Sequence, residues 1–282
     1  MKIAISGSTG MVGRYLKDYL GVEVIGLTRE ILADDESLLN ALKDCDGIIN
    51  LAGATISKKW TDSYKKELYE SRIQTTKKIV NALGKLDNKP KVFISTSAVG
   101  IYEDGFSSSE KEAIYGNDFL ANLAKDWEKE ALRAKNELGI KTTIFRFGVV
   151  LSKSGGALKQ MELPFKLGLG GKIGNGKNII SWIHIKDLAK AIKLALNEDI
   201  KDDIYNLTSP NSISNEAFSK ELASALNRPM FFTIPVFVLK LKLKEGVTVL
   251  TSSVDAKPKK LLDNGFKFEY PLLKEALSDI YS

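Results

Sequence analysis

The sequence predicts an α/β fold, a doubly wound parallel sheet with helices on both faces and a small C-terminal α/β lobe. Two observations support this prediction. Short apolar runs typical of strands alternate with amphipathic helical segments over the first 150 residues, which favours a parallel sheet with helical crossovers. In addition, a glycine-rich turn joins the first of these strands directly to the first helix.

The first predicted strand, Lys2–Ser6, is followed by glycines at positions 7, 10 and 13 and then by apolar side chains at helical spacing up to Leu20. Gly7 permits a backbone conformation that a Cβ would disfavour, Gly10 leaves room for a pyrophosphate, and Gly13 lets the helix lie close to the strand. Because free amides and the dipole at a helix start attract phosphate, we predict nucleotide binding; the alternative is a purely structural turn. The predicted contacts in this turn are Gly7, Ser8, Thr9, Gly10, Met11, Val12 and Gly13.

The second predicted strand, Val22–Leu27, ends at Thr28 and Arg29. In a dinucleotide-binding sheet the residue at this point faces the adenosine ribose, where a carboxylate would bind the hydroxyls and repel a 2′-phosphate. No carboxylate ends this strand, and Arg29 offers a guanidinium fork to phosphate instead. We therefore predict NADP(H) rather than NAD(H), with Thr28 and Arg29 as contacts; the alternative is an arginine that only covers the adenine.

The next strands are predicted from shorter signals. A very short third strand is expected around Glu30–Ala33 and a brief helix at Glu36–Lys43. The fourth strand, Gly47–Leu51, is followed by small residues that leave space for a dinucleotide lying across the strand ends. The predicted cofactor contacts at this strand end are Asn50, Leu51, Ala52 and Gly53.

Two long helices and two further strands complete the predicted sheet. The helices are expected at Tyr64–Leu83, after the capping segment Trp60–Ser63, and at Asp118–Leu138, with Asn117 as the cap. The strands are expected at Lys91–Ser95 and Lys141–Phe145, the first running into Thr96, Ser97 and Ala98.

The character of the sequence changes after residue 150. Glycine-rich loops at 154–156 and 168–176 either line a substrate cleft or are plain connections. Further elements are a strand at Ile179–Ile185, a helix at Leu188–Asn197 capped by Asp187, a strand at Asp203–Thr208, and a helix from Ser214 to about Leu226. We assign residues 1–150 and 179–200 to an NADP-binding Rossmann domain, and residues 151–178 and 201–282 to substrate-side loops and the C-terminal lobe.

Composition argues against several other classes of protein. The 282 residues are 44% hydrophobic and 27% charged, as in ordinary globular proteins. No apolar run approaches the roughly 20 residues of a membrane span and no signal peptide fits before the first strand, so we expect no membrane partner. A single cysteine, Cys45, fits a reducing cytoplasm and, with only one histidine, argues against a metal site. The net charge of +6 is spread over lysine pairs, which indicates solvated helix faces rather than nucleic-acid binding.

Several motifs together resemble a known family. The patterns Gly7-x-x-Gly10-x-x-Gly13, Asn50-Leu-Ala-Gly53 and Ser95-Thr-Ser-Ala98 resemble the extended short-chain dehydrogenases/reductases. Segments 56–76, 95–102, 117–128, 146–188 and 257–277 resemble, more narrowly, the atypical group called epimerase family proteins, also described as nucleoside-diphosphate-sugar epimerases. The resemblance covers essentially the whole chain. It implies a Rossmann fold with a C-terminal lobe over the cofactor, NADP(H) binding, and a homodimer through the helices at 64–83 and 118–138.

The same resemblance indicates where the chemistry would lie. The parent superfamily uses a tyrosine as acid/base, a lysine four residues later that lowers the tyrosine pKa, and a serine that binds the reacting oxygen. Ser97 stands in the serine position. The tyrosine–lysine pair is missing, because Tyr115 is followed four residues later by Phe119, and Lys125 is preceded four residues earlier by Ala121.

Four further residues are candidates for a role in the site. Tyr102, five residues after Ser97, is a candidate acid, or else packs over the cofactor. Arg72 is expected either to bind a cofactor phosphate or to form a surface ion pair, and Thr96 is a further predicted cofactor contact. His184, the only imidazole, is expected to make a structural hydrogen bond at a strand end.

Two functions follow from these predictions. The first is an NADP(H)-dependent oxidoreductase or epimerase acting on a small polar or nucleotide-linked molecule, which the glycine turn, Ser97 and the separate lobe support. The alternative is a catalytically silent NADP(H)-binding sensor or scaffold, which the missing tyrosine–lysine pair supports.

Overall fold

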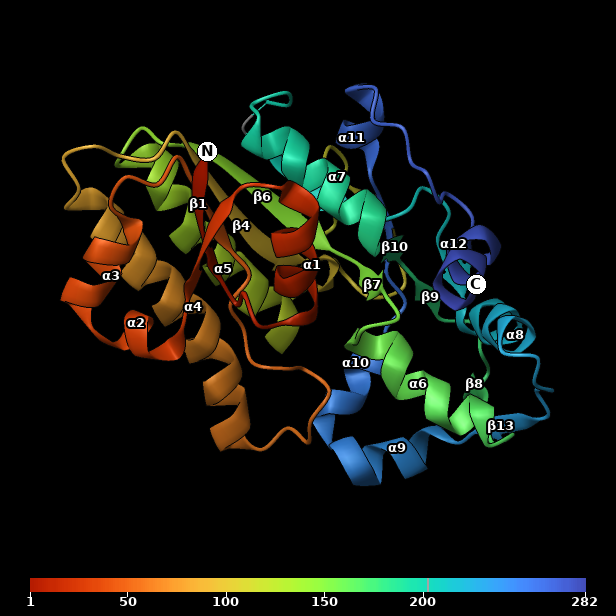
Figure 1. Cartoon of the computed structure of the whole chain (residues 1–282). Coiled ribbons are helices and arrows are strands. Elements are labelled where there is room, and N and C mark those ends of the chain that lie inside the picture. The colour runs from red at the N-terminus through yellow and green to blue at the C-terminus, as the bar shows by residue number, and fades with distance from the viewer. Residues whose placement is uncertain (202) are drawn as a thin grey trace.

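A computed structural model describes residues 1–201 and 203–282. Its centre is a six-stranded sheet in the order β11-β6-β4-β3-β1-β2, and every pairing in it is parallel. Figure 1 shows helices on both sides of this sheet. The predicted doubly wound Rossmann architecture is therefore confirmed. The strands of the sheet are β1 (Lys2–Ser6), β2 (Glu23–Leu27), β3 (Gly47–Asn50), β4 (Val92–Ala98), β6 (Lys141–Phe147) and β11 (Ile204–Leu207).

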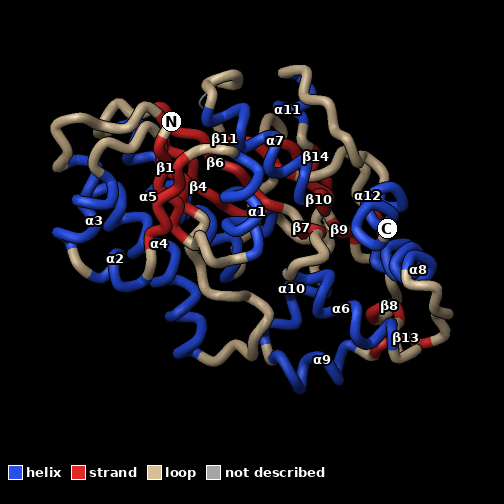
Figure 2. The backbone as a smooth tube through the Cα atoms, viewed as in Figure 1, coloured by secondary structure: helices blue, strands red, loops and turns tan. Residues whose placement is uncertain are grey.

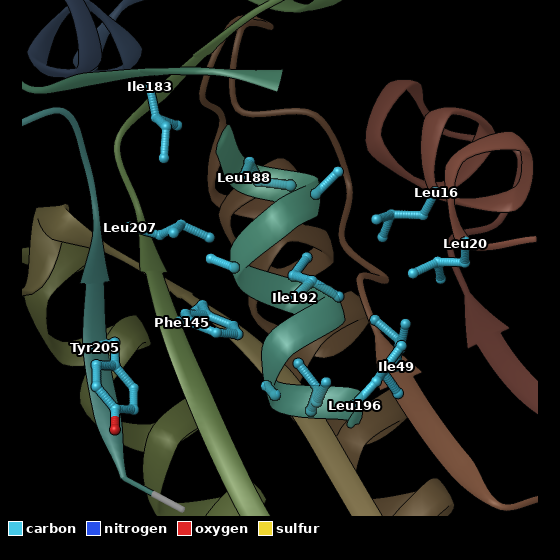
Figure 3. Packing of buried hydrophobic residues seen from close by; sticks show 14 of the residues in the cluster. Leu16, Leu20, Ile49, Phe145, Ile183, Leu188, Ile192, Leu196, Tyr205 and Leu207 are labelled. Atoms are coloured by element: carbon cyan, nitrogen blue, oxygen red, sulfur yellow. The ribbon is translucent and has the colours of Figure 1, made fainter. Parts of the chain in front are cut away.

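The two faces of the sheet follow from alternation along each strand. In β1, Ile3 and Ile5 point into one buried cluster and Ala4 points into the other. Figure 3 shows the first cluster, in which Leu188 and Ile192 of α7 lie beside Leu16 of α1 over the strands of the sheet. The helices of this face are α1 (Met11–Leu20) and α7 (Ile185–Leu196); those of the opposite face are α2 (Arg29–Ala33), α3 (Asp35–Leu42), α4 (Asp62–Gly84) and α5 (Phe119–Asn136).

The strand order reverses at β1, which is hydrogen-bonded to β2 on one side and to β3 on the other. The register pairs Ser6, the last residue of β1, with Leu27 and with Asn50. In doubly wound sheets, ligands bind beyond the carboxyl ends of the strands at such a switch point. The glycine turn after Ser6 therefore lies where this topology positions a ligand.

The predicted third strand is wrong, because residues 29–33 form the helix α2. The Thr28 hydroxyl accepts a hydrogen bond from the Ile31 amide and caps this helix, and the Asp34 carboxylate accepts one from the Ser37 amide and caps α3. Two capping side chains six residues apart favour two short helices over a strand. The predicted helix caps Asn117 and Asp187 are also wrong, because Asp118 caps α5 and His184 caps α7.

The strand predicted at 203–208 joins the central sheet instead of the C-terminal lobe. Its residues 204–207 form β11, and the register pairs Ile204 with Ile144 of β6. The sheet domain therefore includes this part of the segment that we assigned to the lobe. No helix among the described residues is long and apolar enough to cross a membrane.

The C-terminal lobe is built from short strand pairs and helices around a third buried cluster, which includes Leu158 of α6, Phe218 of α8 and Leu277 of α12. Figure 2 shows these elements grouped at one end of the molecule. The strands outside the central sheet are β5 (Ser107–Ser109) with β14 (Asp255–Lys257), β7 (Val149–Leu151) with β10 (Trp182–His184), β8 (Gly171–Ile173) with β13 (Phe232–Ile234), and β9 (Ile179–Ile180) with β12 (Ile213–Ser214). The remaining helices are η1 (Val99–Ile101), α6 (Gly156–Lys166), α8 (Asn215–Ala225), α9 (Val236–Leu243), η2 (Glu245–Val247), α10 (Thr248–Thr251), α11 (Lys259–Asp263) and α12 (Leu273–Tyr281).

Candidate functional site

The glycine turn between β1 and α1 has the geometry that its spacing predicts. Gly7 has a φ of +68°, in the left-handed region, and its carbonyl accepts a hydrogen bond of 2.9 Å from the Gly10 amide. A Cβ on Gly13 would lie 2.4 Å from the Gly7 carbonyl oxygen, so only glycine allows α1 to pack this closely. A Cβ on Gly10 would meet only that same oxygen within 4 Å, at 3.1 Å. The outer side of the turn is therefore open to a ligand.

A second helix start lies against this turn. No side chain of the described residues caps the N-terminus of α1 at Gly10 or that of α6 at Gly155. The side chain of Met11 lies beside both Gly155 and Gly156, at 3.3 and 3.0 Å from the positions that their Cβ atoms would occupy. The positive ends of two helix dipoles thus converge, which favours a doubly charged group such as a diphosphate. The sequence indicated the 154–156 loop but not its position against α1.

The end of β2 borders the same turn. A Cβ on Gly26 would lie 2.6 Å from the Ser8 hydroxyl, so Ser8 packs directly against β2. Arg29 begins α2 there and its side chain is exposed. A second cation, Arg14, donates a hydrogen bond of 2.6 Å from Nη1 to the Thr9 carbonyl. Arg14 was not predicted from the sequence, although it follows Gly13 directly in the first turn of the helix.

The polar side chains at the ends of β3 and β4, predicted as cofactor contacts, form hydrogen bonds with other protein groups. The Ser6 hydroxyl donates to Asn50 Oδ1 at 2.6 Å, and Asn50 Nδ2 donates to Thr76 Oγ1 at 2.8 Å. The Thr96 hydroxyl donates to the Asn50 carbonyl at 3.2 Å. All four residues are buried, so Asn50 and Thr96 fix the strand ends and do not offer free side-chain groups to a cofactor.

Ser6 also shapes the site, although it was predicted only as the last residue of a strand. Its hydroxyl accepts hydrogen bonds from the amides of Leu51 and Ala52, at 3.1 and 3.2 Å. The Leu51 carbonyl oxygen lies 2.9 Å from where a Cβ on Gly7 would be, so this segment forms the wall directly behind the turn. The predicted residues Leu51 and Ala52 therefore shape the site through their backbone.

Arg72 is held against Gly53 at the same edge of the sheet. Its guanidinium donates hydrogen bonds of 3.0 Å to the carbonyls of Leu68 and Ala54, and it lies over the Trp127 ring with its Cζ 5.3 Å from the centroid. A Cβ on Gly53 would lie 2.9 Å from that Cζ atom. Burial lowers the pKa of Arg72 to about 10, and no described carboxylate contributes to the shift. Arg72 is therefore a cation without an acidic partner, and the predicted surface ion pair is wrong.

The two candidate catalytic residues belong to one buried network. The Ser97 hydroxyl donates to Glu128 Oε1 at 2.7 Å, and Arg146 binds the same carboxylate with Nε and Nη2, both at 2.7 Å. The side chains of Glu128 and Arg146 are 7% and 3% exposed. Burial alone would lower the pKa of Arg146, but the Glu128 carboxylate raises it above its ordinary value. In this structure, Ser97 is therefore a hydrogen-bond donor to the buried Glu128–Arg146 ion pair.

Tyr102 is the other end of this network. Its phenol donates to Asn206 Oδ1 at 2.7 Å and accepts a hydrogen bond of 2.8 Å from Arg146 Nη1. Burial raises the pKa of Tyr102 to about 12, although the nearby Arg146 guanidinium acts in the opposite direction. An acid/base tyrosine needs a lowered pKa, so in this position the phenol is not set up as an acid, and both predicted roles of Tyr102, acid or packing over the cofactor, stay predictions.

Comparison with known proteins identifies the family. Residues 3–208 match the NAD dependent epimerase/dehydratase family, and residues 234–280 match a domain of unknown function called DUF1731. The chain belongs to the NAD dependent epimerase/dehydratase family. The epimerase family protein SH2119 of Staphylococcus haemolyticus is 35% identical, over 98% of this chain and 97% of that protein. The epimerase family protein SERP0438 of Staphylococcus epidermidis is 36% identical over the same shares.

Two solved epimerase structures are similar to the whole chain. The human epimerase family protein SDR39U1, crystallised with NADPH, is 30% identical and superposes with a TM-score of 0.92, over 100% of this chain and 99% of that one. A nucleoside-diphosphate sugar epimerase from Corynebacterium glutamicum is 28% identical with a TM-score of 0.80, over 100% of this chain and 58% of that one. The resemblance to atypical epimerase family proteins is therefore confirmed.

Two further predictions for this epimerase family chain concern residues away from the turn. His184 Nδ1 accepts a hydrogen bond of 3.3 Å from the Lys186 amide at the end of β10, which confirms its structural role. Burial lowers the pKa of His184 to about 4, so the imidazole is neutral at pH 7. Helices α4 and α5 pack together through Ile73, Leu123 and Trp127, and a homodimer through residues 64–83 and 118–138 stays a prediction.

Proposed function

We propose that this chain binds NADP(H) and is an oxidoreductase or epimerase acting on a small polar or nucleotide-linked molecule. The observation that carries the proposal is the β1–α1 turn, whose outer side is open and whose helix start has no side-chain cap among the described residues. The human relative crystallised with NADPH supports the same cofactor. The single, buried cysteine, Cys45, supports a reducing cytoplasm as the location.

In this proposal, different residues of the chain bind different parts of the cofactor. The amides of Met11, Val12 and Gly13 and the start of α6 hold the diphosphate. Arg29, at the tip of β2, pairs with the 2′-phosphate, because a guanidinium binds phosphate in a bidentate manner. Arg72, fixed without an acidic partner, adds positive potential at the strand ends. Bound NADPH supplies a hydride to the reaction.

A catalytically silent NADP(H)-binding sensor or scaffold is the second candidate, and a specific observation favours it. The Ser97 hydroxyl donates a hydrogen bond to Glu128, and the Tyr102 phenol is buried between Asn206 and Arg146. Neither hydroxyl is free for a reacting oxygen unless the network opens. The two candidates share the cofactor and differ only in whether chemistry follows.

Calorimetry on a Gly10→Asp variant tests the shared part. A carboxylate at this position opposes the diphosphate and fills the open side of the turn, so we expect NADPH affinity to fall by about a hundredfold or more. Ser63→Asp, which places a carboxylate in the first turn of α4, is the matched control and should bind NADPH as the unchanged chain does. Equal affinity for Gly10→Asp and the unchanged chain, or no NADPH binding by either, would refute the proposal.

Two activity assays separate the two candidates: NADPH oxidation with a panel of carbonyl compounds detects a reductase, and NMR of nucleotide sugars incubated with the protein detects an epimerase, which consumes no cofactor. If Ser97 binds the reacting oxygen, turnover should fall by about a hundredfold in Ser97→Ala, because a transition-state hydrogen bond is lost. Ser219→Ala removes another fully buried hydroxyl, in α8, and controls for loss of packing. Absence of turnover with every compound, alongside tight NADPH binding, would favour the silent protein.

A further inference from the structure

Helix α9 is apolar and yet unburied. Its eight residues, Val236–Leu243, read VFVLKLKL, and none of them is buried. Phe237 is 67% exposed and Leu241 is 77% exposed. Apolar helix surface is normally covered by the rest of its own protein, and here most of it is left exposed within the described chain.

Neighbouring segments extend the same apolar surface. Phe231, which is 81% exposed, directly precedes β13, whose first residue, Phe232, pairs with Gly171 of β8. Arg228 Nε donates a hydrogen bond of 3.1 Å to the Lys166 carbonyl, which ties this segment to the end of α6. Figures 1 and 2 both show α6, β8, β13 and α9 at one end of the molecule. We call this surface the apolar end face; its exposed residues are Leu163, Leu167, Leu169, Phe231, Phe232, Phe237, Val238 and Leu241.

The segment that carries β13 and α9 is positively charged. Residues 222–244 contain four cations, Arg228, Lys240, Lys242 and Lys244, and no aspartate or glutamate; the flanking Glu162 and Glu245 are paired with Lys166 and Lys65. Lys242 also lines a hollow of about 550 Å³ together with Lys58 and Lys59. In a symmetric contact between two copies the same lysines would face each other, which disfavours a second copy as the partner. The partner that fits is apolar and anionic.

The composition of the face favours a lipid surface over an acidic protein. Its eight apolar side chains are all exposed. Partner helices and peptides usually dock into an apolar groove, whereas exposed phenylalanine and leucine flanked by lysine are typical of segments that lie in a membrane interface. Lysine side chains near such a surface pair with anionic headgroups.

We propose that the apolar end face docks this protein on an anionic membrane surface. The phenylalanine and leucine side chains enter the boundary between headgroups and acyl chains, and the lysines of α9 contact lipid phosphates. Such docking needs no spanning helix. It revises the expectation of no membrane partner, which considered only spanning segments and signal peptides.

Vesicle co-sedimentation of the full chain tests this proposal. The probes are vesicles of equal parts phosphatidylglycerol and phosphatidylcholine, and vesicles of phosphatidylcholine alone. We expect binding to the anionic vesicles only, weakened by salt, with partitioning reduced about tenfold or more in Phe237→Ser/Leu241→Ser and in Lys240→Glu/Lys242→Glu. Matched controls are Leu262→Ser, an exposed leucine of α11, and Lys77→Glu/Lys129→Glu, which make the same chemical changes elsewhere.

Each outcome decides the question. All variants change exposed residues, and an unchanged NADPH affinity shows that each one is folded. Sedimentation lost in the end-face variants and kept in the controls supports the proposal. Failure to bind anionic vesicles, or binding that the end-face variants leave unchanged, overturns it. A dimeric mass in light scattering that Phe237→Ser/Leu241→Ser converts to a monomer also overturns it, because a second copy would then cover the face.

Discussion

Two parts of the same sheet edge differ in how they use polar groups. At the ends of β1 and β2 the turn is open, the start of α1 has no side-chain cap among the described residues, and Arg29 is exposed. At the ends of β4 and β6 the polar side chains bind each other, and Arg146 is 2% exposed. The first region offers unpaired groups to an anion, and the second presents a nearly closed interior.

This difference separates groups that are available to a ligand from groups that stabilise the fold. The features proposed to hold a dinucleotide are backbone amides and cations that have no acidic partner among the described residues, so they gain energy only when a ligand binds. The network of Ser97, Glu128, Arg146 and Tyr102 already has its partners, so it contributes to stability in the absence of any ligand. Variants in one region should therefore affect cofactor affinity, and variants in the other should affect folding.

The largest expected effect is on the closed region. Arg146→Met leaves the Glu128 carboxylate buried without its cation, which should lower the free energy of unfolding by about 3–5 kcal/mol. Urea unfolding at neutral pH measures this change. NADPH affinity of the fraction that stays folded should be unchanged, because Arg146 does not reach the glycine turn.

Glu70→Gln is the matched control for that measurement. Its surface pair with Lys66 spans 3.7 Å and both side chains are more than half exposed, so removing it should change stability by less than about 0.5 kcal/mol. If Arg146→Met lowered the free energy of unfolding by no more than this control, the network would not be the closed interior that the structure indicates.

The open region could be predicted because its signals are local. Three glycines within seven residues, between a strand and an amphipathic helix, specify a turn whose backbone does the binding. The fold class followed for a similar reason, since apolar periodicity marks each strand and helix by itself. The strand expected at 30–33 failed because the capping side chains of Thr28 and Asp34 outweighed a weak apolar run.

The closed region could not be predicted because its partners are distant in the chain. Ser97 is 31 positions from Glu128, and Tyr102 is 104 positions from Asn206. The sequence placed Ser97 and Tyr102 near each other but gave no sign that a buried carboxylate would accept a hydrogen bond from the serine hydroxyl. The role of Asn50 was missed for the same reason, since its partners Ser6 and Thr76 come from other elements.

The next prediction concerns the choice of cofactor in the open region. Arg29→Glu removes the guanidinium proposed for the 2′-phosphate and adds a charge that repels it, so NADPH affinity should fall about ten- to a hundredfold. NADH affinity should change by less than about threefold, because NADH lacks that phosphate. Calorimetry with both cofactors measures the ratio. Lys17→Glu, at the far end of α1, is the control, and equal losses for the two cofactors would contradict the assignment.

The smallest expected effect concerns the pH at which Tyr102, in the closed region, loses its proton. Burial raises the pKa of Tyr102 to about 12, so its phenol should stay protonated wherever an unfolded tyrosine does, and stability from this group should be lost only as the pH rises from 10 to 12. At neutral pH, Tyr102→Phe should therefore lower the free energy of unfolding by only about 1 kcal/mol, the value of a lost hydrogen bond.

Ultraviolet difference titration of the unchanged chain against Tyr102→Phe, with and without NADPH, measures the pH at which the phenol ionises. A tyrosine step below about pH 9 when NADPH is bound would show that the cofactor opens the network, and Tyr102 would then regain its place as a candidate acid.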